Sequence, residues 1–273
     1  MKKTFTRNFT TRFRNVLIHS GKDGVHKTGL TTHLASAALL MNCTRLRLFE
    51  IDRQTLLSDL FPEHCSNLHL SSAEDLAARS TADIEKLDEL FEALVDEAPD
   101  LVICDVGAGY ENYVFEAMLR SGLPNILSST GKETAMLIPF DGSDESIAAA
   151  ARASQQGAIA LPHAVQIFCS SQRNFHPNTT KSRKLWDEHI ASHVAQNGLM
   201  VFPSLGVDVY DVFTASRMAP HRFAQLDAAE LARISGQKRF VSNSAILQLS
   251  ALTAHVSREA ERLLGFRQSE PAE

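Results

Sequence analysis

Eight consecutive residues near the start of the chain have the composition of a loop that holds phosphate groups. The segment Gly21-Lys-Asp-Gly-Val-His-Lys-Thr28 follows a short apolar run and precedes residues with helical spacing. In such a loop, backbone N–H groups and the N-terminus of the helix face phosphate oxygens. Lys27 would reach the terminal phosphates, and the hydroxyl of Thr28 would hold Mg²⁺. The segment meets the pattern GxxxxGK[ST] except that His26 replaces the second glycine.

Acidic residues end two other apolar runs. Asp105 follows four apolar residues, at a place where a carboxylate can order the water shell of Mg²⁺. Glu50 and Asp52 end the run Leu46–Ile51, where a carboxylate can orient an attacking water. Two plainer interpretations stay open. Asp105 can be an ordinary strand-end residue, and Asp52 can cap a helix over Thr55–Leu60.

Apolar runs and helical segments alternate along the chain. The predicted strands are Asn15–His19, Leu46–Ile51, Leu101–Cys104, Ala135–Pro139, Val165–Cys169 and Leu199–Pro203. The predicted helices are Thr28–Asn42, Thr81–Glu97, Glu145–Gln156 and Ala245–Leu264. Strands that are apolar throughout and alternate with helices indicate an α/β fold, with a mostly parallel sheet flanked by helices. Ligands bind at the carboxyl ends of such strands, so we expect segments 19–28, 50–52 and 105–109 to converge.

These segments resemble the deviant Walker A ATPases typified by ParA and MinD, a family of P-loop NTPases. The loop of that family reads KGGVGKTT, and this chain has Lys22-Asp-Gly-Val-His-Lys-Thr-Gly29. Glu50–Gln54 is similar to the DxDPQ segment of the family, and Asp100–Gly109 is similar to its DxxIxDxPxG strand. Phe202-Pro203 resembles a late Ile-Pro strand end. The resemblance covers roughly Asn15 to Leu264, with specific motifs only in the first part of the chain.

The resemblance implies an ATP-dependent dimerising switch that uses ATP and Mg²⁺. It implies a homodimer in which Lys22 reaches the nucleotide of the partner subunit, while Lys27 and Asp52 act in hydrolysis. It places the metal at Thr28 and Asp105. Its partners would be an adaptor protein and non-specific DNA, as in plasmid partition, conjugative transfer or cargo positioning. The nucleotide-binding residues it implies are Gly21, Lys22, Gly24, Val25, His26, Lys27, Thr28 and Gly29.

Four positions depart from the family pattern. His26 puts a Cβ and a ring where glycine lets the backbone approach phosphate closely, and Asp23 adds a negative charge to an anion cradle. Glu50 replaces the first aspartate of the DxD pair, and Val106 stands near a common Thr or Ser. A second interpretation is therefore a catalytically degenerate adaptor with weak or no ATP hydrolysis. A third, a P-loop kinase or synthetase for a small metabolite, needs a substrate pocket that the sequence does not indicate.

Two polar regions have open assignments. The loop after the strand Val165–Cys169 either contacts the nucleotide base or is an ordinary polar loop, and its candidate residues are Ser170, Ser171, Arg173 and Asn174. Basic residues within Gln172–Lys184 and at Lys238-Arg239 either form a DNA-facing patch, which counterion release would reward, or a solvated face.

Composition narrows the class of protein further. Nothing between the first and last hydrophobic segments of the 273 residues looks like a linker, which favours one domain with a basic N-terminal extension over 1–14 and a frayed polar tail over 267–273. The hydrophobic content of 44% is ordinary for a globular protein with a sizeable core. A net charge of -5 gives no general attraction to nucleic acid or acidic membranes. The four cysteines form no CxxC pair, which argues against a zinc or iron–sulfur site and fits a reducing compartment. No stretch has the roughly 20 apolar residues of a membrane span, so we predict a cytoplasmic protein.

Overall fold

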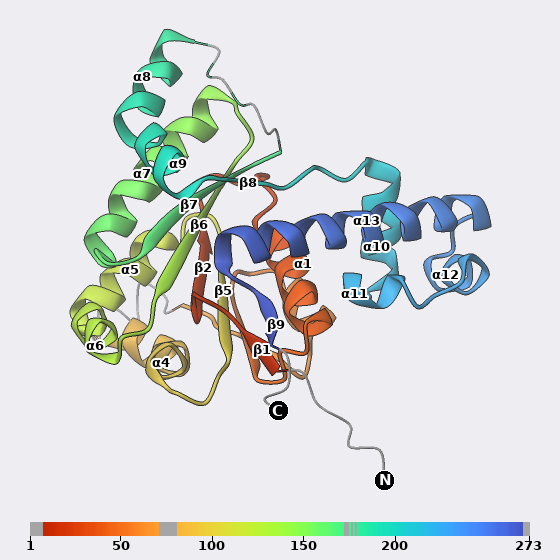
Figure 1. Cartoon of the computed structure of the whole chain (residues 1–273), viewed down its shortest axis with the longest axis horizontal. Helices are drawn as coiled ribbons and strands as arrows, with labels where there is room; N and C mark the ends of the chain where they lie inside the picture. The colour runs from red at the N-terminus through yellow and green to blue at the C-terminus, as the bar shows by residue number, and fades with distance from the viewer. Residues whose placement is uncertain (1–7, 71–80, 172–174, 176, 178, 270–273) are drawn as a thin grey trace.

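The structure is a computed structural model, and it describes residues 8–70, 81–171, 175, 177 and 179–269 (Figure 1). Its centre is a seven-stranded sheet in the order β4-β3-β5-β2-β6-β7-β8, and every neighbouring pair is parallel. The strands are β2 (Asn15–His19), β3 (Leu46–Ile51), β4 (Cys65–Asn67), β5 (Leu101–Val106), β6 (Thr134–Phe140), β7 (Val165–Ser170) and β8 (Leu199–Val201). The predicted α/β class with a parallel sheet is confirmed.

Helices cover both faces of this sheet. One face is packed by α1 (Lys27–Leu40), α2 (Leu56–Leu60), α10 (Val207–Ser216), α11 (Pro220–Phe223), α12 (Ala228–Ser235) and α13 (Arg239–Leu264). The other is packed by α4 (Ala82–Val95), α5 (Glu111–Arg120), α6 (Leu123–Thr130), α7 (Asp144–Ala160), α8 (Thr180–His189) and α9 (Ala191–Asn197). Both faces are therefore buried, which explains why the strands are apolar throughout rather than alternating.

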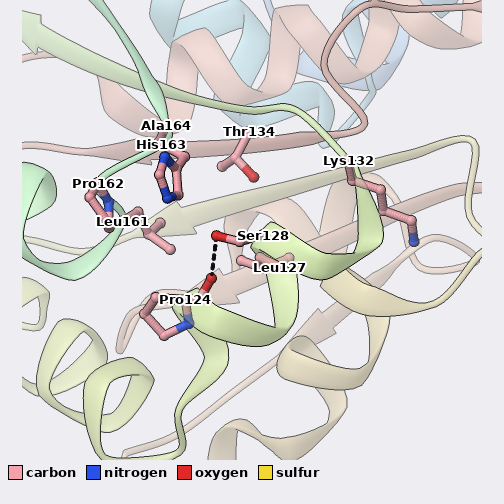
Figure 2. Close-up of a pocket in the computed structure, with 9 residues that line it drawn as sticks. All are labelled: Pro124, Leu127, Ser128, Lys132, Thr134, Leu161, Pro162, His163 and Ala164. Atoms are coloured by element: carbon pink, nitrogen blue, oxygen red, sulfur yellow. Dashed lines mark hydrogen bonds between the residues drawn. The ribbon is translucent and has the colours of Figure 1, made fainter.

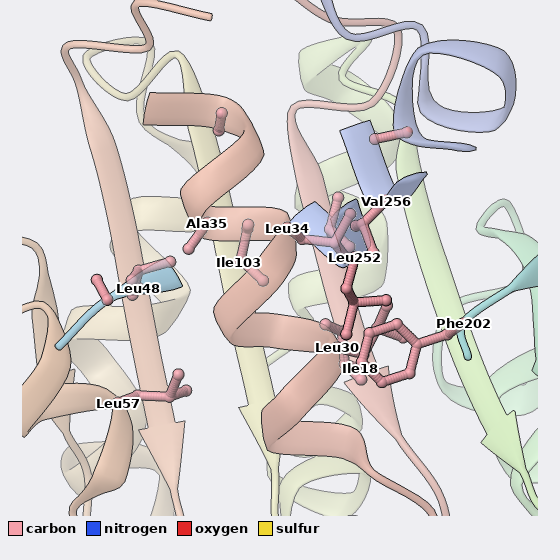
Figure 3. Close-up of a cluster of buried hydrophobic side chains, with 14 of the residues drawn as sticks. Ile18, Leu30, Leu34, Ala35, Leu48, Leu57, Ile103, Phe202, Leu252 and Val256 are labelled. Carbon is pink, nitrogen blue, oxygen red and sulfur yellow. The ribbon is translucent and has the colours of Figure 1, made fainter. Parts of the chain in front are cut away.

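The core on the α1 face fixes the helix that begins at the glycine-containing loop. Leu30 and Leu34 of α1 are fully buried and lie over Ile18 of β2, as Figure 3 shows. Leu252 and Val256 of α13 close the cluster from the other side. Because α1 is held between the sheet and α13, its first residues have a fixed position at the carboxyl edge of the central strand.

Helix α13 behaves as a core helix, as the sequence predicted. Its residues Leu249 and Val256 are almost completely buried, and α1 lies alongside it in Figure 1. It begins at Arg239, six residues before the predicted start at Ala245. Across the described ranges, no helix is both long enough and apolar enough to cross a membrane.

Two described segments near the ends of the chain form regular structure that the sequence did not predict. β1 (Asn8–Thr10) and β9 (Arg267–Ser269) form an antiparallel pair, and the ring of Phe9 meets that of Phe266 edge-on at 5.2 Å. Phe13, which belongs to the predicted N-terminal extension over 1–14, is fully buried. The prediction that the tail frays from residue 267 is therefore wrong for 267–269, because buried aromatic rings anchor both segments; residues 270–273 lie outside the described residues.

Candidate functional site

The loop between β2 and α1 lies at the carboxyl edge of the sheet, in the middle of the strand order. Two of its residues have left-handed backbone conformations, Gly24 with φ 76° and His26 with φ 62°. The α1 N-terminus has no side-chain cap, and its first turn contains no acidic residue. Its first N–H groups therefore remain available, and together with the helix dipole they form a seat for an anion.

His26 occupies the position of the second glycine and pays for it in backbone strain. Its φ of 62° and ψ of 31° are favourable for glycine, but they cost a residue that has a Cβ about 1 kcal/mol or more. The imidazole is exposed at the lip of the loop. The chain therefore keeps the loop path that glycine normally provides, even though the residue has changed.

Lys27 is buried at the centre of this loop. Its side chain is 7% exposed, and its Nζ donates to the carbonyl oxygens of Lys22 at 3.0 Å and Ser20 at 3.3 Å. Both partners are neutral backbone groups of the loop itself. The ammonium charge is therefore not neutralised by these two bonds.

Asp105 and Thr28 meet beside Lys27. Asp105 is paired in register with Ile18 at the end of β5, and its carboxylate is 3% exposed. Burial raises the pKa of Asp105 to about 7, and this effect outweighs the hydrogen bond from the Thr28 hydroxyl and the attraction of Lys27. Oδ1 of Asp105 has no hydrogen-bond partner within the described part of the chain. The expected convergence of the loop and this strand end is present, and it leaves one buried acceptor available.

The acidic end of β3 is used differently from the prediction. The carboxylate of Glu50 accepts the N–H groups of Leu57 at 3.0 Å and Ser58 at 3.3 Å, so Glu50 stabilises the start of α2. Oδ1 of Asp52 accepts the N–H of Arg53 at 2.6 Å and that of the next residue at 3.3 Å. The interpretation that Asp52 caps the helix after it is wrong, because Glu50 fills that role.

Gly107 lets the ends of β3 and β5 approach each other. Its N–H donates to Ile51 O at 2.8 Å, and a Cβ on Gly107 would lie 2.8 Å from that oxygen and 2.8 Å from Asp52 Oδ2. The oxygen belongs to the backbone and cannot swing away. The position therefore requires glycine for close approach, not for an unusual φ.

We expect Gly107→Ala to lower the free energy of unfolding by about 2–3 kcal/mol, as overpacking does in cores. Gly157→Ala is the matched control. Its Cβ would lie 2.5 Å from Met136 Cε, which is the flexible end of a side chain and can move. Urea unfolding of the two variants measures the difference, and equal losses would contradict this account.

Lys22 is held by its own chain. Its Nζ lies 2.7 Å from Asp141 Oδ2 and 3.1 Å from Ser143 Oγ, just beyond the end of β6. Burial alone would raise the pKa of Asp141, but hydrogen bonds from Lys22 and Ser143 outweigh it and lower the pKa to about 2. Lys22 and Lys27 therefore have separate positions, one at the rim of the loop and one at its centre.

A narrow hollow adjoins the loop at the carboxyl ends of β6, β7 and β8. Its wall includes His26, Asp141, Ser170, Ser171 and Phe202. Two of the residues predicted to contact a base, Ser170 and Ser171, thus line it, while residues 173 and 174 lie outside the described residues.

A second narrow hollow lies at the opposite edge of the sheet. Figure 2 shows it beside Thr134, where β6 begins, and Ala164, which precedes β7. Its one ammonium group, that of Lys132, donates to Val95 O at 2.7 Å and to the carbonyl oxygen of Asp96. Because it is at the amino ends of the strands and its cation is bonded to backbone, it is not part of the loop site.

Two buried groups near the loop were not found from the sequence. Glu111 is the first residue of α5 and is 5% exposed; its Oε2 accepts the N–H of Gly109 at 2.8 Å. His19 ends β2, is completely buried, and packs edge-on against Phe115 with ring centroids 5.0 Å apart. The signal for Glu111 was an acidic residue two positions after Gly109, the second of the glycines that follow Asp105. The sequence indicated His19 only as the last residue of a predicted strand.

Together the sheet, the loop and the uncapped α1 define an α/β protein of the parallel, three-layer class, with its candidate site at the carboxyl edge of the central strands. No protein-family model matches the sequence, and no curated protein matches it.

The solved structures that are similar to the chain include three of MinD proteins. The septum site-determining protein MinD of Pyrococcus horikoshii OT3, complexed with Mg-ADP, is 14% identical, with a TM-score of 0.47, over 92% of this chain and 97% of that one. The MinD cell division protein of Aquifex aeolicus is 15% identical, with a TM-score of 0.42, over 95% and 99%. A chain of the MinC:MinD cell division protein complex of Aquifex aeolicus is 15% identical, with a TM-score of 0.41, over 95% and 98%. At these identities the similarity concerns the fold alone.

Proposed function

We propose that this chain is an ATP-dependent dimerising switch of the ParA/MinD type. The observation that carries the proposal is the buried ammonium of Lys27, which within the described residues is bonded only to loop carbonyls and is flanked by the uncapped N-terminus of α1. A cation and a row of free N–H groups that converge on one point suit a chain of phosphates.

The residues present fit Mg²⁺ and a nucleotide. Oδ1 of Asp105 is a buried acceptor without a partner in the described ranges, and the hydroxyl of Thr28 lies next to the same carboxylate. Thr28 would hold the ion and Asp105 would hold its water shell. When bound, Mg²⁺ neutralises charge on the phosphate oxygens. Ser170, Ser171 and Phe202, which lie beside the loop, would contact the nucleoside.

Lys22 supplies the dimer part of the proposal. In the single chain its ammonium is paired with Asp141 at the rim of the loop, where the side chain is only partly covered. Exchange of this partner for a phosphate on a second copy would couple nucleotide binding to dimerisation. The two states would differ in affinity for an adaptor protein, which is what makes such a protein a switch.

DNA as a further partner stays a prediction. Within the described part of the basic segment, Lys181, Arg183 and Lys184 are exposed on α8. Lys184 Nζ lies 3.8 Å from Glu188 Oε1, so part of this charge is already compensated.

The trans role of Lys22 has a direct test. We expect Lys22→Ala to bind Mg·ATP nearly as well as the wild type but to stay monomeric, because the loop retains Lys27. Asp141→Asn, which releases Lys22, is the matched variant and should still dimerise with Mg·ATP. Light scattering at saturating nucleotide measures whether each variant is a monomer or a dimer. A Lys22→Ala protein that dimerises like the wild type would rule out this role.

The alternative, a degenerate adaptor with a spoiled pocket, is favoured by the strain at His26. Two substitutions of His26, which differ in the backbone freedom they allow, distinguish this adaptor from a working nucleotide-binding loop. His26→Gly removes the strain and the ring, while His26→Asn removes the ring and still accepts a left-handed backbone. For a working loop we expect both to bind Mg·ATP within a few-fold of the wild type. A large gain in affinity for His26→Gly would favour the adaptor; a fluorescent ATP analogue measures it.

A further inference from the structure

Glu111 is a buried carboxylate with one oxygen fixed and one available. It is the first residue of α5, and its Oε2 accepts the Gly109 N–H at 2.8 Å. Oε1 is buried and finds no hydrogen-bond partner among the residues that the structure describes. A buried acceptor left unpaired costs free energy, so such a group is unusual unless something else occupies the space beside it.

Glu111 lies within electrostatic range of the loop. Burial raises the pKa of Glu111, and hydrogen bonds from the backbone N–H groups of Glu111 itself and of Gly109 lower it; smaller effects come from two loop residues, Lys27, which lowers this pKa, and Asp23, which raises it. Charges on the loop therefore act on Glu111 from across the site. Beneath α5, Phe115 packs against the buried ring of His19, which makes this side of the site dry.

The carboxylates of β3 are less suited to act on a water molecule. Glu50 is saturated by the backbone of α2 and by Asn67 Nδ2 at 3.2 Å. Asp52 holds its own turn through Oδ1, and its Oδ2 is the atom that a Cβ on Gly107 would meet. Within the described residues, the buried carboxylate oxygens near the loop that have no hydrogen-bond partner are Oδ1 of Asp105, the magnesium candidate, and Oε1 of Glu111.

We propose that Glu111, rather than Asp52, orients the water that attacks the terminal phosphorus of the bound nucleotide; this rests on the proposed function. The water oxygen forms a bond to phosphorus, and the bond from phosphorus to the bridging oxygen breaks. The electron pair leaves with the nucleoside diphosphate, and one water proton passes to Oε1 of Glu111 and then to solvent. The bond from Gly109 holds the carboxylate in place while this happens.

The test is single-turnover hydrolysis of Mg·ATP by the full chain, beside binding of a fluorescent ATP analogue. Glu111→Gln keeps an oxygen for Gly109 but cannot take the proton. We expect it to bind nucleotide within a few-fold of the wild type and to hydrolyse it about a hundredfold more slowly, which is the range of general-base catalysis. Glu116→Gln, an exposed change on the same helix, is the matched control and should hydrolyse normally.

The outcomes separate the two proposals. Glu111→Gln that hydrolyses at the wild-type rate overturns the role of Glu111, as does a wild type that binds Mg·ATP without hydrolysing it; both leave the binding switch standing. A folded wild type that binds no nucleotide overturns both proposals. If Glu111→Gln does not fold, Glu111→Asp takes its place, because it keeps the charge and withdraws it by one methylene. Slow hydrolysis with normal binding would support the proposal, and wild-type hydrolysis would overturn it.

Discussion

Replacement of Lys27 by methionine is expected to weaken Mg·ATP binding by about a hundredfold or more while the chain stays folded. The reason is that Lys27 is 7% exposed and, among the residues that the structure describes, its ammonium donates only to two loop carbonyls, so its charge is available to phosphate. Charge-assisted hydrogen bonds of this kind contribute roughly 1.5–3 kcal/mol each, and about 1.4 kcal/mol is a factor of ten in affinity. Methionine keeps most of the apolar stem that packs in the loop.

The control for this prediction is Lys86→Met, an exposed lysine of α4 on the far side of the sheet from α1. It should bind like the wild type, and circular dichroism should show both variants folded. Titration with a fluorescent ATP analogue measures the affinities. A Lys27→Met protein that binds within threefold of the wild type would mean that the loop is not a phosphate site.

Asp105→Asn is expected to change stability and function in opposite directions. Without metal, the buried carboxylate must ionise as the pH rises, and its pKa in the folded state is about 7 against an ordinary value of 3.8. Because the folded state holds this proton more tightly, the stabilisation is complete below the unfolded pKa and is lost as the pH rises through 7. The Asp105→Asn variant has no ionisable group at this position, so it does not lose stability in this way. It should, however, weaken the Mg²⁺-dependent part of nucleotide binding by about tenfold or more, as the loss of one charged contact does.

Urea unfolding in EDTA at pH 5 and pH 8 measures the predicted change in stability. We expect the wild type to lose about 3 kcal/mol more than Asp105→Asn between the two pH values, since roughly two pH units lie between pH 5 and the folded pKa. The buried histidines His19 and His33 titrate in both proteins and cancel in the difference. Parallel pH profiles for the two proteins would show that Asp105 does not ionise in the folded chain, contrary to this account.

The sequence predicted the parts of the molecule in which local pattern and global position agree. Strands β2, β3 and β5 are unbroken apolar runs because both faces of the sheet are covered, and parallel pairing brings their carboxyl ends to one edge. The meeting of Asp105 with the loop follows from that geometry alone. Element boundaries shifted by a few residues, as at α13, because helix ends depend on capping and packing.

Features decided by contacts between distant segments were missed. β4 is a three-residue edge strand with the polar sequence Cys65–Asn67, so it has no apolar signal. β1 and β9 pair across almost the whole chain, and no local pattern records that. The same holds within the site. The side chains of Lys22 and Asp141 meet although they lie 119 residues apart in the sequence. That Glu50 rather than Asp52 bonds the start of α2 depends on where α2 packs against the end of β3.

The most direct test of the central claim is calorimetric titration of the wild-type chain with ATP, with and without Mg²⁺, alongside light scattering. The account predicts saturable binding to one site per chain, tighter with Mg²⁺, together with a shift from monomer to dimer. No heat and no change of mass at millimolar nucleotide, in a sample shown to be folded, would contradict it and leave the chain as an adaptor with an unused loop.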